Sequence, residues 1–459
     1  MLTVIQNFVS KNLSQIAIVL CAIGTLSVTI NQGFWQEKNK VIKHDIISYY
    51  AYLPGSVIYG DITLYKPNEN WQKYEDKEFY PGKNSEGYIV HKMTSGVAIL
   101  YSPFFLIAHG YALITDHSPS GFSVPYRIAL ILASVFYAII GLVFLRKLLL
   151  RYFPEITTAL TLLAIFLGTN LLYYTSYSAA MSHSFSFALV SIFLFFVPKW
   201  HENQSIKNSI VLGVTVGLIA LIRPTNILIV IVFVLFDIHS FKEIGKRIKL
   251  FFVQKPLLTA LMTVMAILVW VPQMWYWYLA TGKWIYYSYN EEGFFWGDSK
   301  IWKGLFSFRK GLFIYSPILF FLFLAIFNSK RIKEWRVGFI PFFLLFSYVT
   351  FAWWCWWYGG SFGSRPMIDI YALLAIPLAA GINVLTSKGK IATSLFSAVL
   401  GFFIYLNFFQ SKQAAECQIH YDAMTPKAYW AIFLQDKWPP EQYLEYTDAE
   451  KAMKGEERY

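Results

Sequence analysis

Long apolar runs separated by short charged segments make up most of the 459-residue chain. Windows of about 17 to 25 apolar residues recur, and at 1.5 Å per residue each forms a helix long enough to cross a hydrocarbon core about 30 Å thick. The pattern predicts an all-α fold, a polytopic transmembrane bundle of about eleven spans within a range of ten to thirteen. The expected spans are residues 13–31, 125–145, 156–172, 182–198, 208–221, 225–237, 256–279, 312–327, 337–354, 367–385 and 392–410.

The apolar segment 95–114 is left out of this count because of the basic cluster that follows it. Clusters of Lys and Arg favour the cytoplasm, and one more crossing before Arg146 would place its cluster outside. With Pro103, His109 and Gly110 in its interior, the segment is predicted to be a broken, re-entrant or interfacial element. Kinked spanning helices contain such residues too.

A second interruption lies at IRPTN, residues 222–226, where Pro224 removes a backbone donor from any continuous helix. Two short helices that meet at Arg223 would place its guanidinium in a cavity or beside an anionic partner. One long kinked helix would instead let Arg223 extend to a membrane interface. The pattern leaves both forms open.

Charge sets the expected orientation. Four basic clusters, around Arg146, Lys246, Arg331 and Lys388, are predicted to be cytoplasmic. The segments expected outside are the first loop 32–124, the loops 281–311 and 355–366, and the tail 411–459, which has six basic and nine acidic residues. The chain is thus predicted to form one transmembrane domain, residues 1–410, with interfacial helices in its first external loop and an extracytoplasmic tail. The run 13–31 has no small-residue cleavage signal and is expected to be an uncleaved anchor.

Composition supports a membrane protein, with 56% hydrophobic, 19% aromatic and only 14% charged residues. The net charge of +12 comes from separate clusters and not from a continuous basic stripe, so no nucleic-acid partner is expected. Three cysteines lack any CxxC spacing, which predicts neither a metal site nor a disulfide framework. A Cys355–Cys417 bridge on the outer face is the alternative.

Asp45 is the first candidate for chemistry. If the segment around Asp45 is helical, Asp45 shares a face with Tyr49 and Tyr52. An amphipathic helix there would lie along the membrane surface. A carboxylate at that depth can act as a base on an acceptor hydroxyl. The alternative is a solvated loop acid that orders Lys43 or His44.

Basic side chains next to apolar runs suit a phosphate group. His91 and Lys92 directly precede the segment 95–114, where they would contact a phosphate leaving group or, for Lys92, anchor the chain at the interface. His183 begins an expected span, where it would contact a phosphate or cap and pack the helix.

Aromatic residues surround the remaining candidates. In FAWWCWWYGGSFGSRPMIDIY, residues 351–371, the rings of Trp356 and Trp357 can stack on a sugar and Arg365 can bind phosphate bidentately. Asp369, four residues after Arg365, is expected to form an ion pair with it. The loop 281–311 adds Glu291 and Glu292 among many aromatic residues and resembles a lid or acceptor-binding loop.

Motifs of other enzyme classes are missing from the sequence. It contains no HExxH and no GxxxxGK[ST], and no serine is expected in the strand-to-helix elbow of a GxSxG nucleophile. These absences argue against zinc hydrolase, nucleotide hydrolase and serine hydrolase chemistry.

Four motifs occur in a recognisable order: H-K-x-x-x-G-x-A-x-L-x-x-P-F-F at 91–105, M-S-H-x-x-S-F at 181–187, L-I-R-P-T-N at 221–226 and W-Y-G-G-S-F-G-S-R at 357–365. With an acid soon after the first span, they resemble the GT-C superfamily of integral-membrane glycosyltransferases. More narrowly, the chain resembles the bacterial branch related to protein O-mannosyltransferases and to the aminoarabinose transferase that modifies lipid A. The resemblance covers about residues 10 to 410.

This resemblance implies transfer of a hexosyl or pentosyl group from a polyprenyl-phosphate-linked donor to a lipid, glycan or protein acceptor. It implies an integral protein of the bacterial inner membrane, with its active site facing outside. By this resemblance Asp45 matches the position of the family's catalytic base. Lys92, Arg223 and Arg365 would lie near the donor phosphate, and His183 would lie at the active-site rim. Family members often have a second acid beside the first.

In this chain the neighbours of Asp45 are His44 and Ile46. They favour a metal-independent, inverting transfer with no cofactor, and leave a divalent metal as the alternative. Two other functions stay open, a transporter or flippase of a lipid-linked sugar, which would also use a broken helix, and a non-enzymatic scaffold of envelope assembly.

Overall fold

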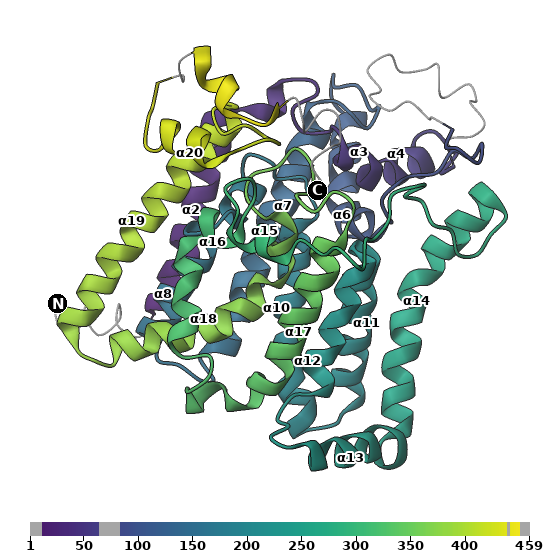
Figure 1. Cartoon of the computed structure of the whole chain (residues 1–459). Helices are drawn as coiled ribbons and strands as arrows, with labels where there is room; N and C mark the ends of the chain where they lie inside the picture. Colours follow the sequence, from purple (N-terminus) through teal and green to yellow (C-terminus); the bar gives the residue numbers. More distant parts are fainter. Residues whose placement is uncertain (1–11, 64–82, 438–440, 450–459) are drawn as a thin grey trace.

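The computed structural model describes residues 12–63, 83–437 and 441–449. Within these ranges the chain forms helices and turns, and strand-like pairing is limited to two isolated bridges, Lys83 with Ile89 and Phe294 with Trp353 (Figure 1). The predicted all-α fold is confirmed. Residues 64–82 of the first external loop and residues 438–440 and 450–459 of the tail lie outside the described residues.

Eight helices of the described part are long and apolar enough to cross a membrane. They are α2 (Leu13–Gln32), α6 (Gly96–Leu113), α7 (Val124–Leu149), α10 (His183–Glu202), α14 (Pro256–Thr281), α17 (Lys333–Ala352) with the 3₁₀ turn before it from Lys330, α18 (Tyr371–Thr386) with the 3₁₀ helix before it from Arg365, and α19 (Lys390–Ala415). The other expected spans contain shorter helices, α8 (Glu155–Leu167), α11 (Ile206–Ile222), η2 (Pro224–Ile229) with α12 (Val230–Val234), and α16 (Leu312–Tyr315) with η4 (Pro317–Leu324). The chain is therefore an integral membrane protein.

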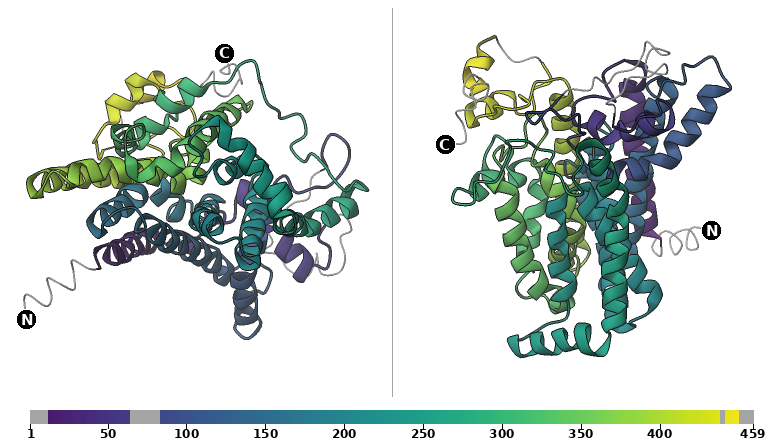
Figure 2. Two further views of the ribbon diagram at one scale, coloured as in Figure 1. Left: turned by 90° about the horizontal axis from the view of Figure 1, so that it is seen from below. Right: turned by 90° about the vertical axis from the view of Figure 1, so that its right-hand side faces the viewer.

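The bundle is built around α18, whose residues from Tyr371 to Ile382 are all buried. α10 packs against both α7 and α18, while α19 and α14 stand at opposite sides of the molecule (Figure 1, Figure 2). Small residues allow the closest contacts. A Cβ on Gly141 of α7 would lie 2.7 Å from the ring of Phe187 in α10, so only glycine fits that crossing without a shift.

The basic clusters gather at one end of the bundle, where the amphipathic helix α13 (Phe241–Lys249) lies (Figure 1). Arg331 donates to the carbonyl of Tyr152 at 2.7 Å, and the backbone N–H of Asp237 donates to that of Glu334 at 2.8 Å. The short helices α3 (Asp45–Tyr50), α4 (Tyr52–Val57) and α20 (Pro426–Ile432) lie at the opposite end. The segments expected inside and outside are thus separated in space.

The sequence predicted a broken element at residues 95–114. This part of the prediction is wrong, because α6 runs through Pro103 without a break. Proline cannot donate to the carbonyl of Ile99 four residues earlier. The hydroxyl of Ser102 donates to that carbonyl instead, at 2.8 Å, and so satisfies the group that Pro103 leaves open. Whether α6 crosses the bilayer or lies re-entrant within it stays a prediction.

At Arg223 the structure selects the first of the two forms that the sequence left open. α11 ends at Ile222, Arg223 is extended with φ −150° and ψ 112°, and the 3₁₀ helix η2 starts at Pro224. The two segments pack against each other, so Arg223 occupies the turn between them.

The three cysteines are free, Cys21 and Cys355 being buried and Cys417 exposed. The alternative of a Cys355–Cys417 bridge is therefore wrong. The tail instead packs through its own apolar cluster, which includes Tyr429 and Tyr443, onto Tyr315 of α16 and Phe362 of the loop 355–366.

Candidate active site

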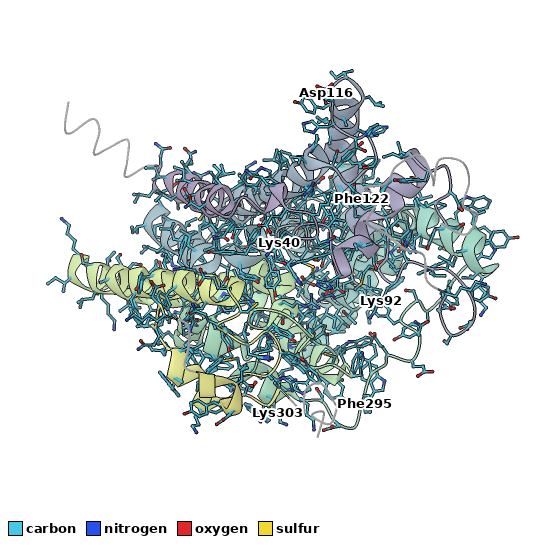
Figure 3. The ribbon with its side chains drawn as sticks, turned by 90° about the horizontal axis from the view of Figure 1, so that it is seen from above. Lys40, Lys92, Asp116, Phe122, Phe295 and Lys303 are labelled. Atoms are coloured by element: carbon cyan, nitrogen blue, oxygen red, sulfur yellow. The ribbon has the colours of Figure 1, made fainter. Side chains whose placement is uncertain are left out.

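One cavity of about 330 Å³ opens at the end of the bundle opposite α13. Its walls come from segments far apart in the sequence: α3, the turn before α6, the turn before η2, the loop 281–311 and the loop after α17. The lining residues that bear charge are Asp45, Lys92, Arg223, Glu292 and Arg365. Figure 3 shows this face from above, with Lys92 labelled. Six of the predicted site residues, these five and Tyr49, thus meet in one place.

Asp45 is the first residue of α3, directly after His44, whose φ of 48° turns the chain into the helix. Its Oδ2 lies 3.1 Å from Nη1 of Arg365. Burial raises the pKa of Asp45, but Arg365, Lys92 and Arg223 together lower it further, so the pKa lies below its usual range. Asp45 is therefore a carboxylate at neutral pH, held among cations.

Arg223 is held by a buried acid. Its Nη1 lies 3.3 Å from Oδ2 of Asp369, which also accepts from Nδ2 of Asn226 at 2.9 Å. The other oxygen of Asp369 lies 3.0 Å from Nδ1 of His183. His183 is fully buried in this network behind Arg223, and not at the rim of the cavity.

The predicted ion pair between Arg365 and Asp369 is replaced by two others, Arg365 with Asp45 and Arg223 with Asp369. The cause is local. Residues Arg365–Ile370 form a 3₁₀ helix, in which residues three apart, and not four apart, share a face.

Lys92 contacts the loop 281–311 rather than a helix. Its Nζ lies 2.5 Å from Oε1 of Glu292 and 5.5 Å from the ring centre of Tyr289, and its carbonyl accepts from the hydroxyl of Ser288 at 2.7 Å. Lys92 is about half-exposed, with 40% of its side chain accessible. Ion pairs of that kind contribute little energy, so an anion can take the place of Glu292.

Donor groups remain open on both arginines. Among the described residues, Nε of Arg365 is buried without a hydrogen-bond acceptor, and Nη1 of Arg223 makes no hydrogen bond beyond its 3.3 Å ion-pair contact with Asp369. A buried guanidinium donor without an acceptor is costly, and an anionic group in the cavity would supply one.

The rings that line the cavity are Tyr49, Tyr287, Tyr289, Phe294, Trp353, Trp354 and Tyr358. The predicted Trp356 and Trp357 do not line it. The Arg309 guanidinium lies 3.8 Å from the ring centre of Trp357, and the indole N–H of Trp357 donates to Asp422 of the tail. Sequence reasoning identified the tryptophan cluster but not which of its members line the cavity, since an irregular loop has no periodicity that assigns faces.

His91 and Tyr52 support the cavity from behind. The His91 ring stacks on Tyr276 with 5.3 Å between ring centres, and the hydroxyl of Tyr52 donates to the carbonyl of Met93 at 2.7 Å. Burial lowers the pKa of His91 to about 4, so its imidazole is neutral and adds no charge to the site. Both residues fix the turn that positions Lys92.

Glu291 lies in a separate surface pocket with Glu86 and Lys283. Adjacent acids of one loop thus serve different pockets, and Tyr287 lines both.

The loop that ends at Arg365 is fastened to the tail by Lys310. Lys310 is buried, and its Nζ donates to the carbonyls of Ser361 and, at 2.6 Å, of Tyr421. The neighbouring Arg309 donates from Nε to the carbonyl of Asp422 at 2.7 Å. Both side chains therefore connect the tail to the loop behind the cavity.

Stability is expected to rise with pH because of Lys310. Burial lowers the pKa of Lys310 to about 7, while lysines of the unfolded chain titrate near 10.4. Between these values the unfolded chain binds more protons, so the free energy of unfolding rises by up to about 1.4 kcal/mol per pH unit. Thermal unfolding in detergent from pH 7 to 9.5 measures this. Lys310→Met should lose the rise and the exposed-lysine control Lys303→Met should keep it, whereas parallel profiles for all three proteins would contradict the assignment.

No protein-family model matches the sequence, and no curated protein matches it. Solved structures of the Archaeoglobus fulgidus oligosaccharyltransferase do match its fold. The enzyme tethered through a disulfide bond to an acceptor peptide containing the NVT sequon matches 96% of this chain, with 12% identity and a TM-score of 0.50. The apo form matches 95% of this chain, with 13% identity and a TM-score of 0.49. The chain covers only 59% and 60% of those two proteins. The likeness at a TM-score of 0.50 concerns the fold alone: the chain is polytopic and all-helical, with a fold similar to that of this oligosaccharyltransferase.

Proposed function

We propose that this protein is a membrane glycosyltransferase, which moves a hexosyl or pentosyl group from a polyprenyl-phosphate-linked donor to an acceptor hydroxyl. The main observation behind this proposal is the cavity itself, where the ionised Asp45 lies among Lys92, Arg223 and Arg365 and is bordered by aromatic rings. A base, a set of phosphate-binding cations and flat apolar faces for a sugar are the groups that such a transfer needs.

In the proposed reaction Asp45 accepts the proton of the acceptor hydroxyl. The hydroxyl oxygen attacks the anomeric carbon from the side opposite the phosphate, and the bond between that carbon and the phosphate oxygen breaks. Its electron pair stays on the phosphate, where the open donors of Arg223 and Arg365 stabilise the added charge. One attack from the opposite side inverts the anomeric configuration.

Arg365 connects the two halves of this reaction. It pairs with Asp45 at 3.1 Å, while its Nε remains available for the donor phosphate. Base and leaving group are thereby held at one guanidinium, which fixes the distance between them. Glu292 would release Lys92 to the phosphate when the donor binds.

The orientation of the bundle supports an extracytoplasmic site. The basic clusters around Arg146, Lys246 and Arg331 lie at the α13 end and favour the cytoplasm, and the cavity lies at the other end. The acceptor is a lipid, a glycan or a protein that reaches the cavity from outside.

A chelator is expected to leave the transfer rate unchanged. Asp45 has no second acid beside it, and among residues 12–63, 83–437 and 441–449 no three His, Cys, Asp or Glu side chains are grouped to hold a metal ion. The measurement is transfer by the purified protein with EDTA and after addition of Mg²⁺, Mn²⁺ or Zn²⁺. Loss of activity with EDTA and recovery with one of these ions would contradict a metal-independent reaction.

The proposal is tested with the purified chain in lipid nanodiscs. A panel of polyprenyl-phosphate sugars is offered, and mass spectrometry follows the release of the polyprenyl phosphate and the mass gain of envelope glycans, glycolipids or proteins. A donor that crosses the bilayer of proteoliposomes without losing its sugar would favour a flippase instead. Cells that lack the gene should lose the mass of one sugar from an envelope component. If neither the transfer assay nor the cells show a change, the remaining function is a non-enzymatic scaffold of envelope assembly.

A further inference from the structure

The helix α13 lies across one end of the bundle, while α11 and α14 beside it run along the bundle (Figure 1, Figure 2). The π-helical turn η3 (Leu250–Gln254) joins α13 to α14, which starts at Pro256 and is long and apolar enough to cross a membrane. Because a spanning helix starts so soon after it, α13 lies at the boundary between hydrocarbon and water. A helix that lies in this boundary is expected to have one apolar and one polar face.

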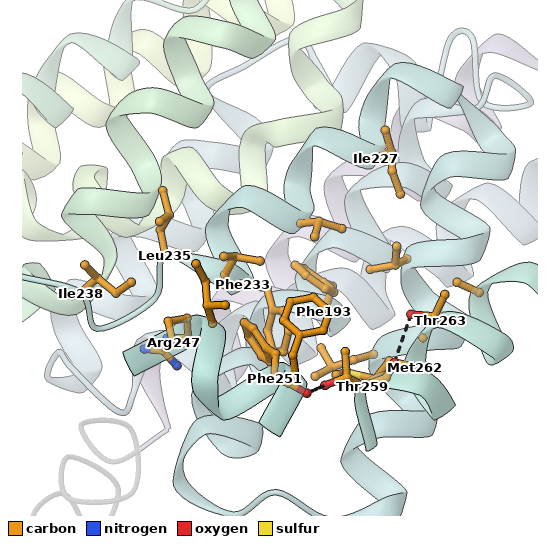
Figure 4. A pocket seen from close by; sticks show the side chains of 18 of the residues that line it. Phe193, Ile227, Phe233, Leu235, Ile238, Arg247, Phe251, Thr259, Met262 and Thr263 are labelled. Atoms are coloured by element: carbon orange, nitrogen blue, oxygen red, sulfur yellow. Dashed lines mark hydrogen bonds between the residues drawn. The ribbon is translucent and has the colours of Figure 1, made fainter. Parts of the chain in front are cut away.

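The apolar face of α13 is turned toward the protein. Ile244, Ile248 and Phe251 are spaced by four and three residues, so they share one face of the helix and its turn. All three line an apolar cavity of about 390 Å³, whose other walls come from α11, α12 and α14 (Figure 4). Arg247 fastens this face, since its guanidinium donates to the carbonyl of Phe236. The side of α13 that meets the bundle is therefore fixed.

The opposite face of α13 is basic. Lys242, Lys246 and Lys249 repeat with the same spacing but are shifted by two residues from the apolar set, which places them about 200° away around the helix. Their side chains are exposed, and their ammonium groups form no ion pair or hydrogen bond within the described part of the chain. The acid of this helix, Glu243, is already used, because its carboxylate accepts from the backbone N–H of His239 at 2.6 Å.

Arginines elsewhere at this end of the bundle bind groups of the protein itself. Arg146 pairs with Glu155 at 3.2 Å, and Arg151 pairs with Glu202. Arg331 donates to a backbone carbonyl at 2.7 Å. These side chains hold helix ends together, whereas the lysines of α13 are left for a partner outside the chain.

Exposed apolar side chains lie next to the basic face and indicate which partner it meets. Phe252 of the turn is 68% exposed and Leu257 of α14 is 83% exposed, and Ile248 and Val253 are exposed as well. Such side chains are unfavourable in water and are expected to lie in hydrocarbon. An acidic protein would account for the lysines but not for this apolar edge. A bilayer with anionic headgroups accounts for both.

We propose that α13 docks on anionic phospholipids, with Lys242, Lys246 and Lys249 binding their phosphates at the bilayer surface while the apolar edge lies among the acyl chains. The docking surface is separate from the candidate active site, which opens at the other end of the bundle. Each lysine near an anionic bilayer surface contributes about a fivefold preference for anionic over zwitterionic lipid. Salt weakens this preference, because it screens exposed charges.

The first experiment is photocrosslinking of the full chain in phosphatidylcholine nanodiscs that contain a trace of phosphatidylglycerol with a diazirine in its headgroup. Labelled peptides should cover residues 241–257. Excess unlabelled phosphatidylglycerol should remove the label, excess phosphatidylcholine should not, and added salt should weaken it. Equal competition by phosphatidylcholine, or label that salt does not change, would overturn the proposal. Absence of label on this segment would also overturn it and would favour an acidic protein as the partner.

The second experiment removes two of the charges with Lys242→Gln and Lys246→Gln in one protein. Label on residues 241–257 should fall by about tenfold, while thermal unfolding in detergent should hardly change, because glutamine forms helices about as well as lysine. The matched control is Lys388→Gln with Lys390→Gln, which removes the same charge from two exposed lysines of the turn between α18 and α19. The control should keep the label. Undiminished label in the folded α13 variant, or an equal loss in the control, would overturn the proposal.

Discussion

Replacing Asp45 with Asn is expected to lower the turnover of sugar transfer by about 10²–10⁴-fold while the protein still folds. The amide has nearly the same shape as the carboxylate but cannot accept the proton of the acceptor hydroxyl at neutral pH. Asp45 lies at the start of α3 and its side chain is 30% accessible, so the substitution removes a base without opening a cavity. Donor binding should change much less than turnover, because Lys92, Arg223 and Arg365 remain.

The measurement is the initial rate of transfer with saturating donor, alongside thermal unfolding in the same detergent. Asp116→Asn is the matched control, since Asp116 is exposed at the far edge of the same face, away from Lys92 (Figure 3). Unchanged transfer in Asp45→Asn would remove Asp45 from the mechanism. If the parent protein transfers no sugar and Asp45→Asn loses only lipid translocation, the protein is a flippase.

The pattern of apolar runs was enough to predict the fold because the bilayer imposes one solution on such a chain. Each of the expected spans contains helix, and the break at Arg223 follows from Pro224. The pattern is less informative inside a helix. Pro103 predicts an interruption of α6, but the hydroxyl of Ser102 replaces the missing donor and the helix continues.

The charged residues of the site were identifiable in the sequence, but their pairing was not. Asp45 and Arg365 are 320 positions apart, and no local rule connects them. The local rule that was applied, an ion pair four residues apart, assumes an α-helix, and Arg365–Ile370 is a 3₁₀ helix. Asp369 was therefore assigned to the wrong arginine.

Loops limited the prediction of the aromatic wall. After α17 the chain is irregular, so Trp353 and Trp354 reach the cavity while Trp356 and Trp357 turn toward Arg309 and the tail. A helix or strand would have assigned these faces through its period, and an irregular loop does not. The roles of Trp356, Trp357, His183 and Glu291 in substrate binding remain predictions.

Replacing Asp369 with Asn is expected to destabilise the protein by about 3 kcal/mol, because it leaves the Arg223 guanidinium without its counter-ion. Asp369 is fully buried and contacts Arg223, His183 and Asn226 at once. The amide keeps the size of the side chain, so the loss reflects charge and not packing. Thermal unfolding in detergent measures it, and Asp436→Asn is the control. Asp436 pairs with Lys412 at 2.8 Å but is 72% exposed, so its loss should cost less than about 1 kcal/mol.

The double variant Arg223→Met with Asp369→Asn separates stability from function. Removing both charges leaves no unpaired ion, and a buried pair replaced by neutral groups of similar volume is often tolerated, so most of the unfolding free energy should return. Sugar transfer should stay low, because the guanidinium proposed to meet the leaving phosphate is gone. If transfer returned together with stability, Arg223 would be a structural residue alone, and the donor phosphate would have to be assigned to Lys92 and Arg365.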